Sequence, residues 1–211
     1  MKPDYEIMLE YVKNALYQSG KDKKEKMYQS FRSRYMHTIR VLKWCERLCV
    51  DCDAKINEYV LYVSAIFHDI GYAIAIEDDS HAEASVQLFS EFCKTHNVQY
   101  SDEISRNIML HSNKSLLNDK STSIELILLM EADLLDETGA LSILFDCMSS
   151  GERHLDSYNK AYERILNFSC SILDYNPMIS KGAVRVWQEK QKLLKEFVTS
   201  LSIDLNIEEG D

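Results

Sequence analysis

Proline and glycine are scarce in this chain of 211 residues, which contains two prolines and six glycines. Few positions therefore interrupt a helix, and leucine, glutamate, lysine and methionine, which favour helices, are well represented. Apolar residues make up 45% of the sequence, enough for a chain of this length to bury a substantial core. The composition predicts an all-α protein.

Long apolar runs and an excess of positive charge are also missing. No stretch approaches the roughly 20 apolar residues of a membrane span, and charged side chains interrupt residues 1–16, so we expect no signal peptide. Acidic residues outnumber basic ones by 34 to 24, giving a formal charge of −10. Such a surface repels phosphate backbones, although a bound metal ion can attract a small anion locally. We expect a cytoplasmic protein that binds neither membranes nor nucleic acid.

Paired cysteine motifs are incomplete. Cys49 and Cys52 form a C-x2-C pair, but the six cysteines include no second pair with the spacing of a zinc-binding module. We therefore interpret the cysteines as reduced side chains of a helical protein in a reducing compartment.

Helical periodicity runs through most of the chain. Apolar residues recur at helical spacing and predict helices at residues 4–18, 31–50, 57–71, 80–94, 101–110, 122–133 and 183–201. We expect a polar break at residues 19–26 and a polar loop at residues 112–120. No internal repeat or long linker separates these segments.

Capping signals mark the beginning of three of these helices. Asn57 is a suitable N-cap for the helix that follows it. The spacing of a capping box occurs at Ser80–Glu83 and again at Thr122–Glu125. We therefore expect His81 to lie in the first turn of its helix.

The doublet His68-Asp69 stands at the end of a predicted helix that is otherwise apolar. Adjacent helix residues point about 100° apart, so both reach one ion only where the helix end faces a cavity. Side chains from facing helices often build a metal site, and imidazole and carboxylate donors suit Mn, Fe, Co, Ni, Zn or Mg. Other predicted helices supply further donors of these two kinds: His37, His81, His111 and Asp133.

Each of these donors has an ordinary alternative role. A single histidine is more often a surface or hydrogen-bonded residue than a ligand, and Asp133 could be a surface carboxylate. Asp133 follows a very apolar segment, however, where an unpaired carboxylate is costly and a cation partner is a natural explanation.

The order of these residues resembles the H…HD…D signature of the HD-domain superfamily of metal-dependent phosphohydrolases. Residues 34–37 (RYMH) are similar to the R-x-x-H opening of many members, and residues 65–71 (AIFHDIG) to their central A-x-x-H-D-I-G segment. His81 and His111 fall where many members have two further histidines. Residues 131–140 (EADLLDETGA) resemble a segment of small bacterial HD hydrolases that lack an assigned substrate.

The resemblance implies an all-α, single-domain HD-type helical bundle. It divides the chain into an N-terminal helix and polar break at 1–30, the metal-binding core at 31–145, and C-terminal helices at 146–211 that complete the same domain. It also implies hydrolysis of a phosphomonoester or a nucleotide-type phosphoanhydride by a metal-bound hydroxide. The expected partner is a small phosphorylated molecule such as a nucleotide.

The resemblance further implies the ligand set. His37, His68, Asp69 and Asp133 would bind one divalent ion, and His81 and His111 a second, with Asp69 bridging the two. We expect two ions of Mn, Fe, Co, Ni or Zn, with Mg as an alternative. With one ion only, His81 and His111 would instead support the ligands or bind phosphate.

Asp69, Arg34 and Lys114 are the candidates for direct roles in catalysis. Asp69 would position the attacking hydroxide between the ions. Arg34 lies one turn before His37 and could hold a phosphate oxygen or form a salt bridge with Asp69. Lys114 could reach substrate phosphate from its loop or remain solvated.

Two further residues have open roles at this stage. Asp136 could orient a ligand histidine or cap a helix end. Tyr72 occupies a position where many HD members have Lys or Glu, so one phosphate-contacting or acid-base group is missing or supplied elsewhere.

Two other functions remain open. A symmetrical dinucleoside-tetraphosphate hydrolase of the HD type would share the R-x-x-H opening and the extra histidines. A non-catalytic HD module that senses a ligand would use the same fold with a degenerate site.

Overall fold

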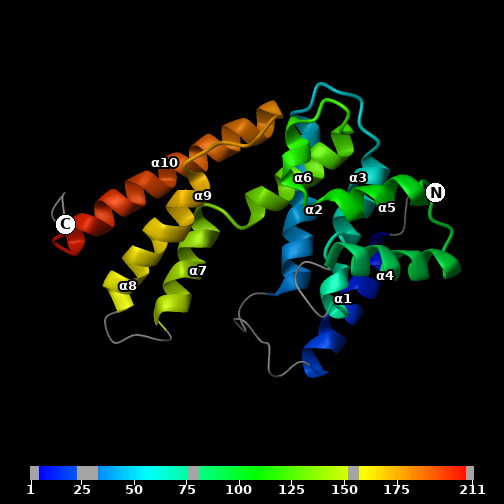
Figure 1. Ribbon diagram of the computed structural model, residues 1–211, viewed down its shortest axis with the longest axis horizontal. Coiled ribbons are helices and arrows are strands. Elements are labelled where there is room, and N and C mark those ends of the chain that lie inside the picture. The colour runs from blue at the N-terminus through cyan, green and yellow to red at the C-terminus, as the bar shows by residue number, and fades with distance from the viewer. Residues whose placement is uncertain (1–4, 23–32, 76–80, 152–156, 208–211) are drawn as a thin grey trace. The chain divides into compact units, whose positions relative to one another are not determined.

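The computed structural model describes residues 5–22, 33–75, 81–151 and 157–207 (Figure 1). Their regular secondary structure is helical throughout, without a strand, which confirms the predicted all-α class. The chain divides into two compact units, Met1–Asp133 and Leu134–Asp211. None of the described helices combines the length and the apolar character that crossing a membrane requires.

The described part of the first unit contains six α-helices, joined by segments that include two 3-10 helices. The bounds of these elements are α1 (Tyr5–Asp22), α2 (Arg34–Val50), α3 (Glu58–Phe67), η1 (Ile70–Ala73), α4 (His81–Thr95), α5 (Ser101–Leu110), η3 (Lys114–Asn118) and α6 (Ile124–Asp136). The division between the two units falls inside α6, after Asp133.

Helix α3 is the central helix of the first unit, in contact with α1, α2, α4 and α5. Asn57 caps its N-terminus as predicted, because the Asn57 side chain accepts a hydrogen bond from the backbone N–H of Val60. The ring of Phe67, in its last turn, lies 5.0 Å from Phe89 and 5.1 Å from Phe92, measured between ring centroids. Burying a side chain of this size contributes about 1.5–3 kcal/mol. The backbone that leads into His68 is therefore held by the core.

The turn after α3 packs closely against the start of α4. The backbone N–H of Gly71 donates to Ser85 Oγ at 2.8 Å. A Cβ at position 71 would overlap the carbonyl oxygen of His81 and the backbone of Ser85. Glycine is therefore required here for steric reasons, and it brings the first turn of α4 against the turn that carries Asp69.

Several predicted boundaries were wrong. Helix α2 begins at Arg34 instead of residue 31, because Ser33 is its N-cap, and α3 ends at Phe67 instead of residue 71. Helix α1 continues to Asp22 instead of ending at residue 18, because weak helix formers at a helix end lower its stability without terminating it. The expected loop at 112–120 contains the 3-10 helix η3. The final helix, α10, spans Lys181–Asp204 because Ser180 caps it by accepting a hydrogen bond from the N–H of Ala183.

The predicted capping box at Thr122–Glu125 was also wrong. Ser123 Oγ accepts a hydrogen bond from the backbone N–H of Leu126, so Ser123 caps α6. Thr122 instead donates to the carbonyl of Leu116, and Glu125 accepts from the backbone N–H of Asn57 at 2.8 Å. Partners distant in sequence thus compete with the local motif. The other predicted box begins at Ser80, which lies outside the described residues.

The second unit contains the remaining helices, and α10 contacts α7, α8 and α9. Their bounds are α7 (Ala140–Gly151), α8 (Ser157–Arg164), the π-helix η4 (Ile165–Cys170), α9 (Ser171–Leu173) and α10. Asp146 on α7 accepts hydrogen bonds from Arg164 Nε at 2.9 Å and Ser169 Oγ at 2.6 Å. Burial raises the pKa of Asp146, and the Ser169 and Arg164 contacts oppose that rise. This cluster connects α7 to both segments that follow it.

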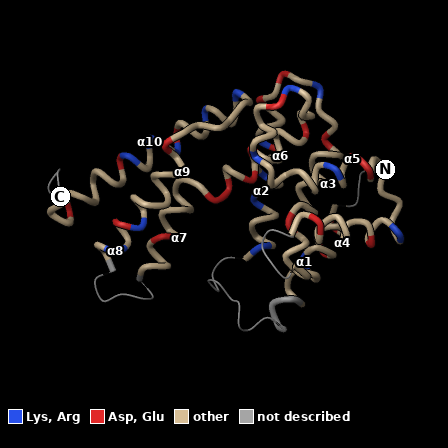
Figure 2. The backbone as a smooth tube through the Cα atoms, viewed as in Figure 1, with Lys and Arg blue, Asp and Glu red and all other residues tan. Residues whose placement is uncertain are grey.

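Charged residues of both signs are interspersed along the helices of each unit (Figure 2). All six cysteines are free, and five of them are partly accessible. Burial raises the pKa of Cys49, so its thiol is protonated at neutral pH.

Candidate metal centre

The structure brings all six predicted ligands together at the ends of helices of the first unit. His37 lies in the first turn of α2, where Ser33 is the N-cap. His68 and His111 are the C-cap residues of α3 and α5, and His81 is the first residue of α4. The remaining two ligands are Asp69, which follows His68, and Asp133 on α6.

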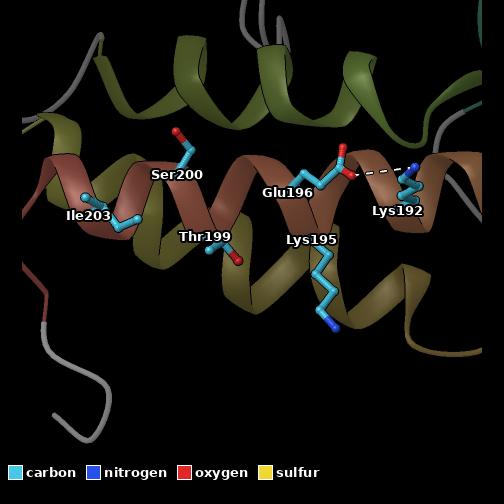
Figure 3. A pocket seen from close by; sticks show the side chains of 6 residues that line it. All are labelled: Lys192, Lys195, Glu196, Thr199, Ser200 and Ile203. Atoms are coloured by element: carbon cyan, nitrogen blue, oxygen red, sulfur yellow. Dashed lines mark ion pairs between the residues drawn. The ribbon is translucent and has the colours of Figure 1, made fainter.

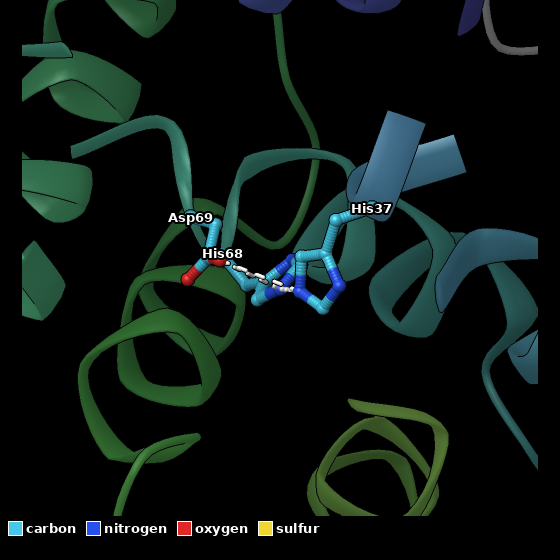
Figure 4. Close-up of side chains that lie close together, drawn as sticks. All are labelled: His37, His68 and Asp69. Atoms are coloured by element: carbon cyan, nitrogen blue, oxygen red, sulfur yellow. Dashed lines mark hydrogen bonds and ion pairs between the residues drawn. The ribbon is translucent and has the colours of Figure 1, made fainter. Parts of the chain in front are cut away.

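One group of donor atoms surrounds His37 Nε2. This atom lies 3.2 Å from His68 Nε2, 3.4 Å from Asp69 Oδ2 and 3.3 Å from Asp133 Oδ1. His68 Nε2 lies 3.7 Å from Asp69 Oδ2 (Figure 4). Ligand atoms that bind one ion at about 2.0–2.2 Å are roughly 3–3.5 Å apart. His37, His68 and Asp69 therefore form a group that could hold one ion, and Asp133 Oδ1 lies beside it, 4.0 Å from His68 Nε2.

A second group of donor atoms surrounds the other oxygen of Asp69. Asp69 Oδ1 lies 3.5 Å from His111 Nε2 and 3.7 Å from His81 Nε2. The two imidazole nitrogens are 3.4 Å apart. Both {His37, His68, Asp69} and {Asp69, His81, His111} are groups that could hold a metal ion. Asp69 belongs to both, with a different carboxylate oxygen in each.

Backbone carbonyls orient two of the imidazoles. His68 Nδ1 lies 2.8 Å from the carbonyl oxygen of Ala65, and His111 Nδ1 lies 2.6 Å from that of Ile108. An imidazole that donates Nδ1–H to a carbonyl presents the lone pair of Nε2 on its other side. Lone pairs and carboxylate oxygens thus converge in both groups, and this donor set fits a divalent cation.

The protonation states of the buried groups are consistent with metal binding. Burial lowers the pKa of His68 to about 4, so this imidazole is neutral at pH 7. Burial alone would raise the pKa of Asp69, but its contacts with His68, His111 and His37 outweigh that effect and hold the pKa well below 3.8. Asp69 is therefore a carboxylate at neutral pH, although its side chain is only 5% exposed.

Arg34 and Lys114 each pair with one of the two aspartates. Arg34 Nη1 lies 3.2 Å from Asp69 Oδ2. Lys114 Nζ lies 2.6 Å from Asp133 Oδ2 and donates to the carbonyl of His111 at 2.9 Å. Burial alone would raise the pKa of Asp133, but the Lys114 ammonium and the neighbouring imidazoles hold it well below 3.8. The sequence left a solvated role open for Lys114, and in the structure its ammonium group contacts both Asp133 and the His111 carbonyl.

Comparison with known proteins identifies the family. The family model of the HD domain matches residues 34–138, a range that includes all six candidate ligands. The chain belongs to the HD-domain superfamily. HD domains are generally metal-dependent phosphohydrolases, so membership supports a metal-dependent hydrolase in general terms. No curated protein matches the chain significantly.

Several solved structures share the fold along nearly the whole chain. A predicted HD superfamily hydrolase from an uncultured Thermotogales bacterium is 18% identical, with a TM-score of 0.63 and coverage of 96% of this chain and 94% of that one. YpgQ of Bacillus subtilis, in complex with ADP, is 16% identical with a TM-score of 0.60, covering 94% and 93% of the two chains. The Lin1889 protein of Listeria innocua is 19% identical with a TM-score of 0.57, covering 96% and 99%.

Two residues near the HD-domain ligands have contacts that the sequence did not predict. Ser112 Oγ lies 3.0 Å from His81 Nε2 and 3.2 Å from His111 Nε2. The ring of Tyr72 stacks on His81. Their only sequence signal is adjacency, because Ser112 follows His111 directly and Tyr72 follows Gly71 of the central segment.

Asp136 is the last residue of α6. It is buried, and it belongs to the second unit, where it interacts electrostatically with Lys190. Lys190 also donates to the carbonyl oxygen of Thr138 at 3.0 Å.

A depression of about 530 Å³ also occurs on the second unit. It lies along α10, where Lys192 pairs with Glu196 at 3.7 Å (Figure 3). The lining residues all come from this one helix: Lys192, Lys195, Glu196, Thr199, Ser200 and Ile203. The depression contains none of the candidate ligands and offers no converging donor set.

Proposed function

We propose that this HD domain is a two-metal phosphohydrolase that acts on a phosphomonoester or a nucleotide-type phosphoanhydride. The observation that carries the proposal is the division of Asp69, whose Oδ2 faces His37 and His68 and whose Oδ1 faces His81 and His111. A carboxylate between two histidine pairs has the arrangement of a bridging ligand.

In this proposal each ion has its own ligand set. His37, His68, Asp69 and Asp133 hold the first ion, and Asp69, His81 and His111 hold the second. Divalent ions at such sites lower the pKa of coordinated water toward 7 and polarise a phosphoryl oxygen. The nitrogen and oxygen donors suit Mn, Fe, Co, Ni or Zn, with Mg as an alternative.

The charges of the site favour an anionic substrate. The positive charges of Arg34 and Lys114 offset the negative charges of Asp69 and Asp133. The charge of bound divalent ions would therefore remain uncompensated until an anion binds. Phosphoryl transfer depends largely on positioning and on stabilising negative charge, so phosphate groups are suitable substrates for this site.

In the proposal, two cations contact substrate phosphate: Arg34, beside Asp69, and Lys114, beside Asp133. Their side chains are 29% and 28% exposed, so a ligand can reach them without displacing the core. The Arg34 guanidinium group and the Lys114 ammonium group each donate hydrogen bonds both to their aspartate and to a phosphoryl oxygen. Asp69 and Asp133 thereby orient the two cations for substrate binding.

A nucleotide is the substrate class that we propose. YpgQ, which has the same fold, was crystallised with ADP. A non-catalytic sensing module would have a degenerate site. The described contacts give no support to that alternative, because all six donor residues are present and converge. A symmetrical dinucleoside-tetraphosphate hydrolase has no specific observation in its favour.

The test combines metal analysis with hydrolysis assays. Purified protein is supplied with Mn²⁺ or Co²⁺ and assayed against nucleoside mono-, di- and triphosphates, with and without a chelator. We expect chelator-sensitive hydrolysis and two bound ions per chain. Asp69→Ala should lose both ions and activity, and combined replacement of His81 and His111 by alanine should leave one ion.

The matched control is His96→Gln, which replaces an exposed histidine outside both donor groups. It should retain two ions and full activity. Full activity and undiminished metal content in Asp69→Ala would overturn the proposed function. A single ion in the unaltered protein would overturn its two-metal form.

A further inference from the structure

Tyr72 lies in the short 3-10 helix that directly follows Asp69. Its backbone N–H donates to the carbonyl oxygen of Asp69 at 3.2 Å, within the short 3-10 helix η1. The side chain is half-buried. Because η1 is only four residues long and packs against α4, the ring of Tyr72 has a defined position relative to the Asp69 backbone.

The ring of Tyr72 stacks flat on the imidazole of His81. The ring centroids are 4.6 Å apart and the planes differ by 11°. His81 Nε2 is the atom that faces Asp69 Oδ1 at 3.7 Å and His111 Nε2 at 3.4 Å. An imidazole binds a metal ion through a lone pair that lies in the plane of its ring. A group that fixes this plane therefore determines where the ion can sit.

Tyr72 also contacts the residue that supports the other oxygen of Asp69. The guanidinium carbon of Arg34 lies 3.9 Å from the centroid of the Tyr72 ring, within the range of a cation–π interaction. The same guanidinium group lies 3.2 Å from Asp69 Oδ2. One aromatic ring thus contacts the His81 imidazole and the cation paired with the carboxylate shared by both donor groups.

We propose that Tyr72 is a positioning residue for the second metal ion, acting through the plane of His81. This inference rests on the proposed two-metal function. The role belongs to the flat ring, which contacts both the His81 imidazole and the Arg34 guanidinium group. At this position the chain therefore contributes an aromatic support for a ligand, where a Lys or Glu would contribute a charge.

Replacing a group that orients a metal ligand typically weakens metal binding by about 10- to 100-fold. We expect Tyr72→Leu to weaken binding of the second ion by a factor in that range. Binding of the first ion should change less, because the imidazole on which Tyr72 stacks belongs to the second donor group. Tyr72→Phe keeps the ring and should bind both ions as the unaltered protein does.

The experiment is a titration of metal-free protein with Mn²⁺. Bound ions are counted after equilibrium dialysis, and electron paramagnetic resonance distinguishes an exchange-coupled Mn²⁺ pair from a single ion. His81→Ala is the reference for loss of the second ion. Tyr158→Leu, in the second unit and 75% exposed, controls for the exchange of tyrosine for leucine. Circular dichroism and retention of the first ion report that each variant is folded.

Loss of the coupled signal in Tyr72→Leu, with its retention in Tyr72→Phe and Tyr158→Leu, is the expected result. If Tyr72→Leu binds two ions as tightly as the unaltered protein, or if Tyr72→Phe loses the second ion, the role of the ring is refuted while the two-metal function stands. If the unaltered protein itself binds one ion, both proposals are refuted. Tyr72→Met provides the same test if the leucine variant does not fold.

Discussion

Asp69 and Asp133, each paired with a cation, illustrate how much depends on single residues in this protein. The Asp69 carboxylate is almost completely buried, yet its contacts hold it ionised. An isolated charge in such a position would be strongly destabilising, whereas a cation or a metal ion compensates for it. The same reasoning from an apolar flank predicted a cation partner for Asp133, and Lys114 is such a partner.

His68 makes the stability of the metal-free protein depend on pH. Its folded-state pKa of about 4 lies below the ordinary value of 6.5 because the imidazole is buried. Between these two values the unfolded chain takes up a proton that the folded chain does not. The stability contributed by the neutral His68 imidazole is therefore fully present above pH 6.5 and is lost as the pH falls toward 4. Over this interval the free energy of unfolding should decrease by up to about 3 kcal/mol.

Urea unfolding of the metal-free protein at several pH values between 7 and 4.5 measures this dependence. His68→Gln should show a smaller loss of stability over this interval than the unaltered protein, whereas His96→Gln should show the same loss. Equal slopes for the unaltered protein and His68→Gln would contradict the prediction.

At the scale of single residues, the sequence indicated the ligand types but not their contacts. His37, His68, Asp69 and Asp133 were named from their order and flanks. The pairing of Lys114 with Asp133, 19 residues away, depends on where η3 lies relative to α6. Such a contact depends on packing between elements, so no local pattern predicts it.

At the scale of elements, helix ends position the site. His68 and His111 occupy the same place, the C-cap of their helices, and each donates to a carbonyl three residues earlier. His81 begins α4, which Gly71 allows to approach η1 closely. The ends of different helices therefore meet around Asp69, and their local geometry orients the donors.

Gly71→Ala tests this close approach. The added Cβ overlaps the backbone of His81 and Ser85, so the first turn of α4 must move away from Asp69. We expect a loss of about 1–3 kcal/mol in the free energy of unfolding, as for other overpacked sites. We also expect weaker binding of the second ion, measured by the Mn²⁺ titration.

Ser85→Ala is the matched variant for that change. It removes the acceptor of the Gly71 N–H without adding volume, and should cost about 1 kcal/mol. Its second ion should be retained. If Gly71→Ala binds both ions with unaltered affinity, the contact between η1 and α4 does not position His81.

The wrong capping prediction for α6 has a cause at this same scale. Thr122 and Glu125 had the correct spacing, but both side chains are engaged by other segments, at Leu116 and Asn57. Ser123 then serves as the cap. When a side chain can form a hydrogen bond either to the nearby helix end or to a distant segment, the sequence motif does not predict which bond forms.

At the scale of the whole molecule, the division into two units raises the question of cooperativity. Helix α6 runs from Ile124 to Asp136, across the division after Asp133. We propose that residues 146–211 complete the same domain as residues 31–145. Metal binding to the first unit should then stabilise the second unit as well, because a ligand stabilises the whole of a cooperative unit.

The variant Trp44→Phe allows the unfolding of the second unit to be measured by itself. The chain contains two tryptophans, so the variant leaves Trp187, buried in the second unit, as the only fluorescent tryptophan. We expect thermal unfolding followed by Trp187 fluorescence to coincide with that followed by circular dichroism. Both midpoints should rise together when Mn²⁺ is added. A fluorescence midpoint that does not respond to Mn²⁺ would indicate two independent domains.

The sequence by itself determined the helical class and the family, and it predicted six candidate metal donors. These depend on residue type, periodicity and order along the chain, which are local or readable in one dimension. Only the tertiary structure decided that Asp69 directs one oxygen to each histidine pair, that Arg34 and Lys114 pair with different aspartates, and that Tyr72 stacks on His81. These features depend on the packing and rotamers of side chains from different segments, which no local sequence pattern encodes.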